Sequence, residues 1–136
     1  MYVKKFIQVP MEQIKNEAQL QKRAAELGLS PVVHRFNKNS ITMEHLGEMC
    51  IADKYGEQIR MIPKWIREQI IEILWTLYSE LDIQYVDVTP YNFVEKDGHV
   101  WIIDFGHAKI NPDSLDPYLE KLFNTWKLSR WNPRFK

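Results

Sequence analysis

The feature that most constrains this fold is a change of hydrophobic periodicity near residue 82. Between residues 63 and 81 apolar side chains recur at helical spacing, which predicts one long helix with a deeply buried face. Pro63 suits the first helical position, because the first turn needs no N–H from that residue. Beyond residue 82 the apolar runs shorten to 83–88, 92–95 and 99–103, which predicts strands. The apolar positions of the long helix are Ile66, Ile70, Ile73, Leu74, Leu77 and Leu81.

The rest of the chain predicts a small sheet and further helices. Residues 2–9 are rich in β-branched and aromatic side chains, which favours a strand, and 11–27 carry the apolar stripe of a helix. Two more strands are expected at 32–36 and 40–45, and shorter helices at 48–55 and 117–128. We therefore expect an α+β fold in one domain, residues 1–136, with a sheet-plus-helix part at 1–46 and a mainly helical part at 47–136.

Composition narrows the class of protein. Of 136 residues, 45% are hydrophobic and 12% aromatic, which indicates a globular domain. Lys plus Arg and Asp plus Glu both number 18, so no excess of positive charge favours a nucleic-acid partner. No stretch predicts a membrane span, and residues 1–10 lack the apolar core of a signal peptide. The single cysteine, Cys50, is expected to be a small core residue of an intracellular (cytoplasmic or nuclear) protein.

The polar residues between 83 and 108 have a distinctive spacing. Asp87 and Asn92 lie five positions apart, Asp97-Gly98 predicts a hairpin turn, and Asp104-Phe105-Gly106 follows the second strand of that hairpin. Each of these residues alone is explained by ordinary turn chemistry, since Asp, Asn and Gly crowd turns. Together they supply the few carboxylate and amide oxygens that Mg²⁺ takes beside phosphate oxygens and water.

This pattern resembles the core of protein kinases, in which a loop H-R-D-x-x-x-x-N is followed by a hairpin and D-F-G. The resemblance implies a truncated protein kinase-like fold with a catalytic-loop hairpin, and ATP and Mg²⁺ as cofactors. It implies that Asp104 and Asn92 hold Mg²⁺ and that Asp87 accepts or orients the proton of the attacking hydroxyl. Gly106 is expected to let the backbone turn sharply beside the metal.

The same resemblance implies an ion pair near the N-terminus. Kinases pair a lysine of a strand with a glutamate of the next helix. Lys4 in Y-V-K-K-F fits the lysine position best, and Glu17 is the natural partner. Lys5 remains a rival, because neighbouring residues of a strand point to opposite faces.

The adenine pocket is expected around residues 41–47, which resemble the strand and hinge between kinase lobes. Met43 would stand at the back of this pocket, or serve as plain core, and backbone groups from Glu44 to Leu46 would bind the adenine edge. Thr89 stands where many kinases have the lysine of D-L-K-P, and we count it among the nucleotide-binding residues.

The chain also departs from the kinase pattern. It shows no G-x-G-x-x-G loop before the lysine strand and no A-P-E after D-F-G, and in this it looks like the reduced Rio-type lineages. Tyr85 and Val86 replace the His and Arg of H-R-D. We expect a nucleotide-dependent phosphotransferase with low activity on its own and a protein Ser/Thr acceptor. Two alternatives stay open: a silent pseudokinase that binds a protein partner, and a small-molecule kinase of the aminoglycoside-phosphotransferase type.

Overall fold

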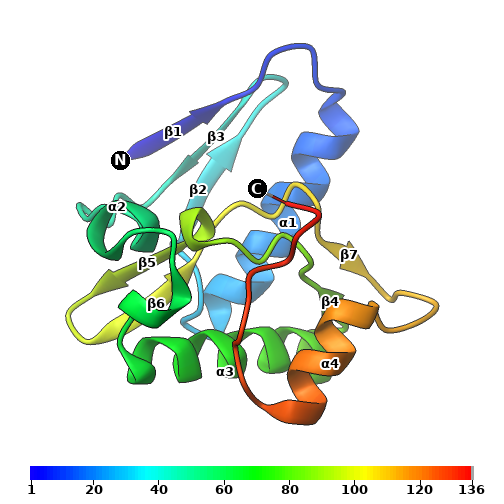
Figure 1. The fold of residues 1–136 in the computed structure, drawn as a ribbon. Coiled ribbons are helices and arrows are strands. Elements are labelled where there is room, and N and C mark those ends of the chain that lie inside the picture. The colour runs from blue at the N-terminus through cyan, green and yellow to red at the C-terminus, as the bar shows by residue number, and fades with distance from the viewer. Residues whose placement is uncertain (136) are drawn as a thin grey trace.

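The N-terminal part of the molecule is a small antiparallel sheet packed against one helix (Figure 1). This is a computed structural model that describes residues 1–135, so Lys136 lies outside the described part of the predicted domain. The sheet order is β1-β3-β2, with β1 (Tyr2–Lys5), β2 (Val33–Phe36) and β3 (Ser40–Met43), and the helix is α1 (Met11–Glu26). β1 forms one edge of this sheet, and its length of four residues keeps that edge short.

The remaining part is mainly helical, with two short pairs of strands. Its long helix, α3, lies across the bottom of the molecule in Figure 1, and α4 lies beside one end of α3. The bounds of the helices are α2 (Ile51–Tyr55), α3 (Lys64–Leu81) and α4 (Pro117–Thr125), with 3-10 turns at Ile59–Met61 and Pro90–Asn92. The strand pairs are β4 (Ile83–Gln84) with β7 (Lys109–Ile110), and β5 (Phe93–Lys96) with β6 (His99–Ile102).

Two hydrophobic clusters hold these parts together. The smaller cluster lies between α1 and the N-terminal sheet, and the larger one gathers around α3. Helix α1 contributes to both, because Leu20 and Ala24 on its C-terminal half reach the larger cluster. The predicted buried face of α3 is confirmed at Ile66, Ile70, Ile73, Leu74 and Leu77, whereas Leu81 is only partly buried. The predicted division into two parts at residues 46 and 47 remains a prediction.

Most predicted elements are present, with differences at their ends. The hairpin at 97–98 is confirmed, and both turn residues have positive φ, 55° at Asp97 and 74° at Gly98, as a type I′ turn requires. The strand expected at 2–9 is too long, because it ends at Lys5 and the backbone turns at Gln8 with a φ of 56°. Pro63 is the N-cap residue of α3 rather than its first helical residue, which is Lys64. The pairing of β4 with β7 was not predicted.

The predicted α+β class is confirmed.

The last helix ends at Thr125, three residues before the predicted 128, because Trp126 takes a left-handed conformation with a φ of 51°. Among residues 1–135, the structure contains no helix with the length and apolar character needed to cross a membrane.

Candidate functional site

One lysine joins the sheet, the helix α1 and the D-F-G segment. The Nζ atom of Lys4 lies 2.6 Å from Oε2 of Glu17 and 3.1 Å from Oδ1 of Asp104. Lys5 is exposed, because the alternation of the strand turns it to the opposite face of β1. The structure therefore pairs Glu17 with Lys4, and it brings together two parts of the chain that lie 100 positions apart.

The D-F-G segment is shaped by its aspartate rather than by its glycine. Asp104 has a positive φ of 64°, and its Oδ1 accepts the backbone N–H of Gly106 at 3.1 Å. The backbone does turn at Gly106, where the N–H of Ala108 donates to the carbonyl of Phe105 at 3.1 Å, but Gly106 has no positive φ. A Cβ atom at Gly106 would instead lie 3.2 Å from Oε1 of Glu17 and 3.3 Å from Oδ1 of Asp104. A side chain at this position would therefore require the carboxylates of Glu17 and Asp104 to shift by a few tenths of an ångström.

The predicted catalytic loop is held by the side chain of Asn92. Its Nδ2 donates to the backbone carbonyl of Asp87 at 2.9 Å, and the residue is 8% exposed. Within residues 1–135, Oδ1 of Asn92 and Oδ2 of Asp104 accept no hydrogen bond, and both residues line the same pocket. Two free oxygens beside a nucleotide-sized pocket fit Mg²⁺, which takes few protein ligands and completes its shell with phosphate and water. In the described part of the chain no three His, Cys, Asp or Glu side chains form a protein-only metal cage.

Tyr85 links the catalytic loop to D-F-G. It stands where kinases have the His of H-R-D, and its hydroxyl donates to the carbonyl of Ile103 at 2.5 Å. Its ring packs edge-on against Phe105 with a centroid separation of 5.3 Å. Complete burial raises the pKa of Tyr85 well above its usual value, so the hydroxyl stays protonated as a donor. Tyr85 therefore connects the predicted catalytic loop to the D-F-G segment next to Asp104.

The site carries more negative than positive charge. Burial alone would lower the pKa of Lys4, but the hydrogen bond and charge of Glu17 and the charge of Asp104 outweigh it and raise that pKa. Burial raises the pKa of Glu17 despite the opposing contact with Lys4. Burial, together with the charge of Asp104, also raises the pKa of Asp87. Lys4 thus contacts two carboxylates, and Asp87 adds a third negative charge to the site, which favours the arrival of a further cation.

A pocket of about 340 Å³ opens beside Lys4 and Asp104. Met43 is 6% exposed and lines this pocket, and Gln21 of α1 contacts its sulfur at 3.4 Å while also donating to the carbonyl of Pro31. Along its rim the carbonyl of Glu44 and the N–H of Leu46 make no hydrogen bond to residues 1–135. An acceptor and a donor are therefore free where an adenine edge was expected to bind. Their role in nucleotide binding remains a prediction.

The comparison with known proteins agrees with this geometry. The family model described as the RIO domain matches residues 4–121. The chain belongs to the RIO domain family. The predicted resemblance to the protein kinase-like superfamily and the predicted kinase-like α+β fold are therefore confirmed. As a RIO domain, the chain is a kinase-like, ATP-binding protein.

A curated relative of this RIO domain comes from Methanospirillum hungatei JF-1. Its name is "Probable bifunctional tRNA threonylcarbamoyladenosine biosynthesis protein", and it is 29% identical over 108 residues. The match covers 75% of this chain and 18% of that protein, so the chain spans less than a fifth of the relative's length.

Two of the singled-out residues lie away from their expected surroundings. Thr89 is buried and lines a second cleft of about 410 Å³ with Asp87, rather than the pocket that contains Met43. Its predicted contact with nucleotide remains untested. Cys50 is not a core residue of the RIO domain, because it is half-buried and lines the pocket beside Leu46. The residues next to Cys50 in the sequence do not indicate whether it is buried in the core or lines a pocket.

The position of the C-terminal segment, residues 126–135, was not predicted from the sequence. After α4 the chain returns across the molecule toward the N-terminal sheet, drawn in red in Figure 1. In this segment Asn132 is 1% exposed and donates its backbone N–H to the carbonyl of Val88 at 3.0 Å. The dipeptide Asn132-Pro133 indicates a turn, but a local turn signal does not show a contact with a loop more than 40 positions earlier.

Proposed function

We propose that this RIO domain is an ATP- and Mg²⁺-dependent phosphotransferase whose acceptor is a serine or threonine hydroxyl of a protein. The observation that carries the proposal is the position of the Lys4 ammonium, which contacts both Glu17 and Asp104 at the edge of the pocket. These two contacts hold the positive charge of Lys4 in a fixed position in the lining of the pocket, next to Asp104. Phosphoryl transfer depends mainly on such positioning and charge neutralisation.

Each of the other residues has a role that its contacts support. Lys4 would bind phosphate oxygens, with Glu17 as the residue that orients it. Oδ2 of Asp104 and Oδ1 of Asn92 would hold the metal, because both oxygens lack hydrogen bonds to the described residues. Bound Mg²⁺ neutralises the charge that develops on the transferred phosphoryl group. Met43 and the rim from Glu44 to Leu46 would bind the base.

Asp87 is the proposed proton acceptor for the attacking hydroxyl. It lines the second cleft, which adjoins the pocket that contains Met43 because Tyr91 and Asn92 line both, so an acceptor molecule in the second cleft would lie next to the nucleotide. Its raised pKa favours this role, since a carboxylate that is costly to keep charged takes up a proton more readily.

A second candidate acceptor class comes from the relative in Methanospirillum hungatei, whose name refers to tRNA threonylcarbamoyladenosine biosynthesis. Because the chain spans 18% of that protein, a role as the ATP-using domain of such a modification system is proposed for this chain only as an alternative. In that case ATP turnover would depend on tRNA or on a partner protein rather than on a serine or threonine.

The test is incubation of the purified protein with radiolabelled ATP and Mg²⁺, alone, with a generic protein acceptor, with an aminoglycoside, and with tRNA. The variant Asp104→Asn removes a metal ligand of the proposed site, and Asp113→Asn is a matched control on an exposed loop. We expect label on protein, lost in Asp104→Asn and kept in Asp113→Asn. The control matters because both substitutions change one carboxylate to an amide.

Other outcomes would select the alternatives. MgATP binding without any transfer or hydrolysis would support the pseudokinase hypothesis. Label on an aminoglycoside in place of protein would support a small-molecule kinase. Turnover that requires tRNA would favour the second candidate. The absence of MgATP binding in a folded sample would refute the proposal.

A further inference from the structure

The carbonyl groups on either side of Asp87 are held from the C-terminal segment. Asn132 donates its backbone N–H to the carbonyl of Val88 at 3.0 Å and its side-chain Nδ2 to the carbonyl of Val86 at 2.8 Å. We propose that Asn132 is a positioning residue that fixes the backbone of the catalytic loop around Asp87. This inference rests on the proposed function, in which Asp87 accepts the proton of the attacking hydroxyl.

Two asparagines, Asn92 and Asn132, bind the backbone carbonyls of this loop. Asn92 donates to the carbonyl of Asp87 itself at 2.9 Å, so three successive carbonyls, those of residues 86, 87 and 88, each accept a side-chain or backbone N–H from an asparagine. The N–H of Val88 also donates to the carbonyl of Val86 at 2.8 Å, which closes a tight turn with Asp87 at its centre. The backbone of Asp87 has little freedom to rotate under these constraints.

The hydrogen bonds of Asn132 are protected from water. The residue is 1% exposed, so water cannot readily replace its side-chain contact with the carbonyl of Val86, which would keep only the N–H of Val88 as a donor among residues 1–135. Its Oδ1 is also occupied, because it accepts the backbone N–H of Arg134 at 3.2 Å. Every polar group of the Asn132 side chain is thus used within the protein, and the orientation of its amide is fixed by these partners.

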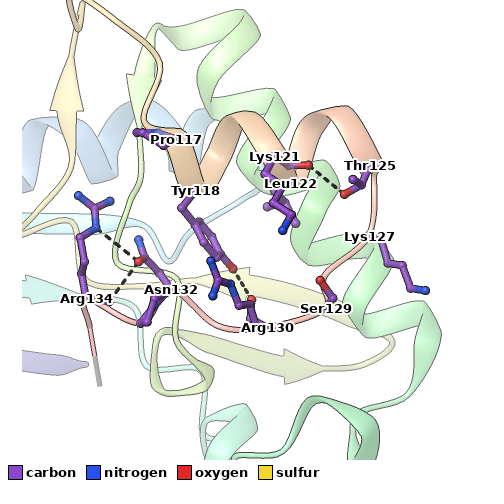
Figure 2. Close-up of a pocket in the computed structure, with 11 residues that line it drawn as sticks. Pro117, Tyr118, Lys121, Leu122, Thr125, Lys127, Ser129, Arg130, Asn132 and Arg134 are labelled. Atoms are coloured by element: carbon purple, nitrogen blue, oxygen red, sulfur yellow. Dashed lines mark hydrogen bonds between the residues drawn. The ribbon is translucent and has the colours of Figure 1, made fainter.

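The segment that carries Asn132 is anchored independently of the loop. Figure 2 shows Tyr118 of α4 reaching the segment, where its hydroxyl donates to the carbonyl of Arg130 at 2.6 Å. Arg134 forms an ion pair with Asp116 at the start of α4, and Trp131 donates its ring N–H to the carbonyl of Glu57 at 2.7 Å. These contacts allow the loop function of Asn132 to be separated from the docking of the segment.

The experiment compares Asn132→Asp and Asn132→Ala with the control Tyr118→Phe. Asn132→Asp keeps the size and the acceptor for Arg134 but replaces the donor that faces Val86 with an oxygen. Tyr118→Phe removes one anchor of the same segment, and the hydroxyl that it loses donates to Arg130 rather than to the catalytic loop. Turnover, KM for MgATP, and amide hydrogen exchange of residues 85–92 are measured for all variants and for the native protein.

We expect both Asn132 variants to lower kcat about 10- to 100-fold, the range for a misplaced catalytic group. Their KM for MgATP should stay within about twofold of native, because Asn132 does not line the pocket that contains Met43. Exchange at 85–92 should become faster in both variants, whereas Tyr118→Phe should leave kcat and loop exchange near native values. Should Asn132→Ala fail to fold, the near-isosteric Asn132→Asp provides the same comparison.

Three results would overturn the inference. The first is native exchange at 85–92 in a folded Asn132 variant. The second is a change of kcat in Tyr118→Phe as large as in Asn132→Asp, which would assign the effect to segment docking. The third is faster loop exchange with native kcat. A native protein without turnover would count against the proposed function instead, and loop exchange would still decide whether Asn132 holds the loop.

Discussion

Removal of the Lys4 ammonium is the most direct perturbation of the candidate site. In Lys4→Met the side chain keeps much of its length and loses its charge, which leaves Glu17 and Asp104 without their cation. Lys5→Met is the matched control, because it makes the same chemical change at the neighbouring position of the same strand. Lys5 is exposed and forms no ion pair with the described residues.

The magnitude follows from the two contacts. At 2.6 Å and 3.1 Å, and an effective dielectric constant of about 20, each attraction amounts to roughly 5–6 kcal/mol before desolvation is subtracted. Desolvation cancels most of this attraction, and the Lys4 side chain is 26% exposed, which calls for a further discount. We expect Lys4→Met to lose about 2 kcal/mol of unfolding free energy, and Lys5→Met to stay within about 0.5 kcal/mol of native.

The loss should depend on pH in a defined direction. Burial already raises the pKa of Glu17 in the native protein, and without Lys4 the charged form becomes still less favourable. A carboxyl whose pKa is higher in the folded state than in the unfolded state makes the folded state less stable as pH rises through that window. The deficit of Lys4→Met should therefore be largest near neutral pH and shrink on acidification, as Glu17 becomes protonated.

Urea denaturation of the three proteins at neutral and at mildly acidic pH measures both quantities. Equal stabilities of Lys4→Met and Lys5→Met at neutral pH would refute the energetic reasoning. A deficit that stays constant or grows on acidification would show that the lost stability comes from packing rather than from uncompensated carboxylates. Low ionic strength is preferable, because salt screens partly exposed pairs.

The remaining predictions concern the metal, the proton acceptor and the loop. Asp104→Asn should abolish the Mg²⁺-dependent part of the rise in melting temperature that ATP produces, measured by thermal shift with and without a chelator. Asp87→Asn should lower turnover and yet raise the neutral-pH unfolding free energy by about 0.5 kcal/mol, a gain that fades on acidification because the raised pKa of Asp87 means its charge is costly. Tyr85→Phe should lose about 1–2 kcal/mol in urea denaturation, because the carbonyl of Ile103 loses its donor.

Local signals predicted most of the fold. The buried face of α3 could be read because helical periodicity is a property of neighbouring residues, and the turn at 97–98 because only a few residue types accept positive φ at both positions. The pairing of β4 with β7 could not be read, since each strand has two residues and 25 positions separate Gln84 from Lys109. Pairing of such short strands depends on the loops that carry them.

The site was predicted from spacing, and its details required coordinates. Asp87, Asn92 and Asp104 follow a family pattern, but the choice between Lys4 and Lys5 depends on which face of β1 meets the cleft. Asn132 could not be found, because its partners are backbone carbonyls, which every residue carries. The turn at Gly106 was expected, whereas the close approach of Glu17 and Asp104 to its backbone was not, because that contact joins distant parts of the chain.

The charge balance of the site bears on what it can bind. The ammonium of Lys4 faces the carboxylates of Glu17 and Asp104, and Asp87 adds a third negative charge whose pKa is raised by burial and, in second place, by the charge of Asp104. ATP without metal would bring further negative charge to this cluster, where the Lys4 ammonium is the cation in direct contact with Glu17 and Asp104. A divalent cation bound at Asp104 and Asn92 would reverse that balance and relieve the repulsion felt by Asp87. Preference for the metal–nucleotide complex over free nucleotide therefore follows from the same excess of carboxylates that destabilises the ligand-free site.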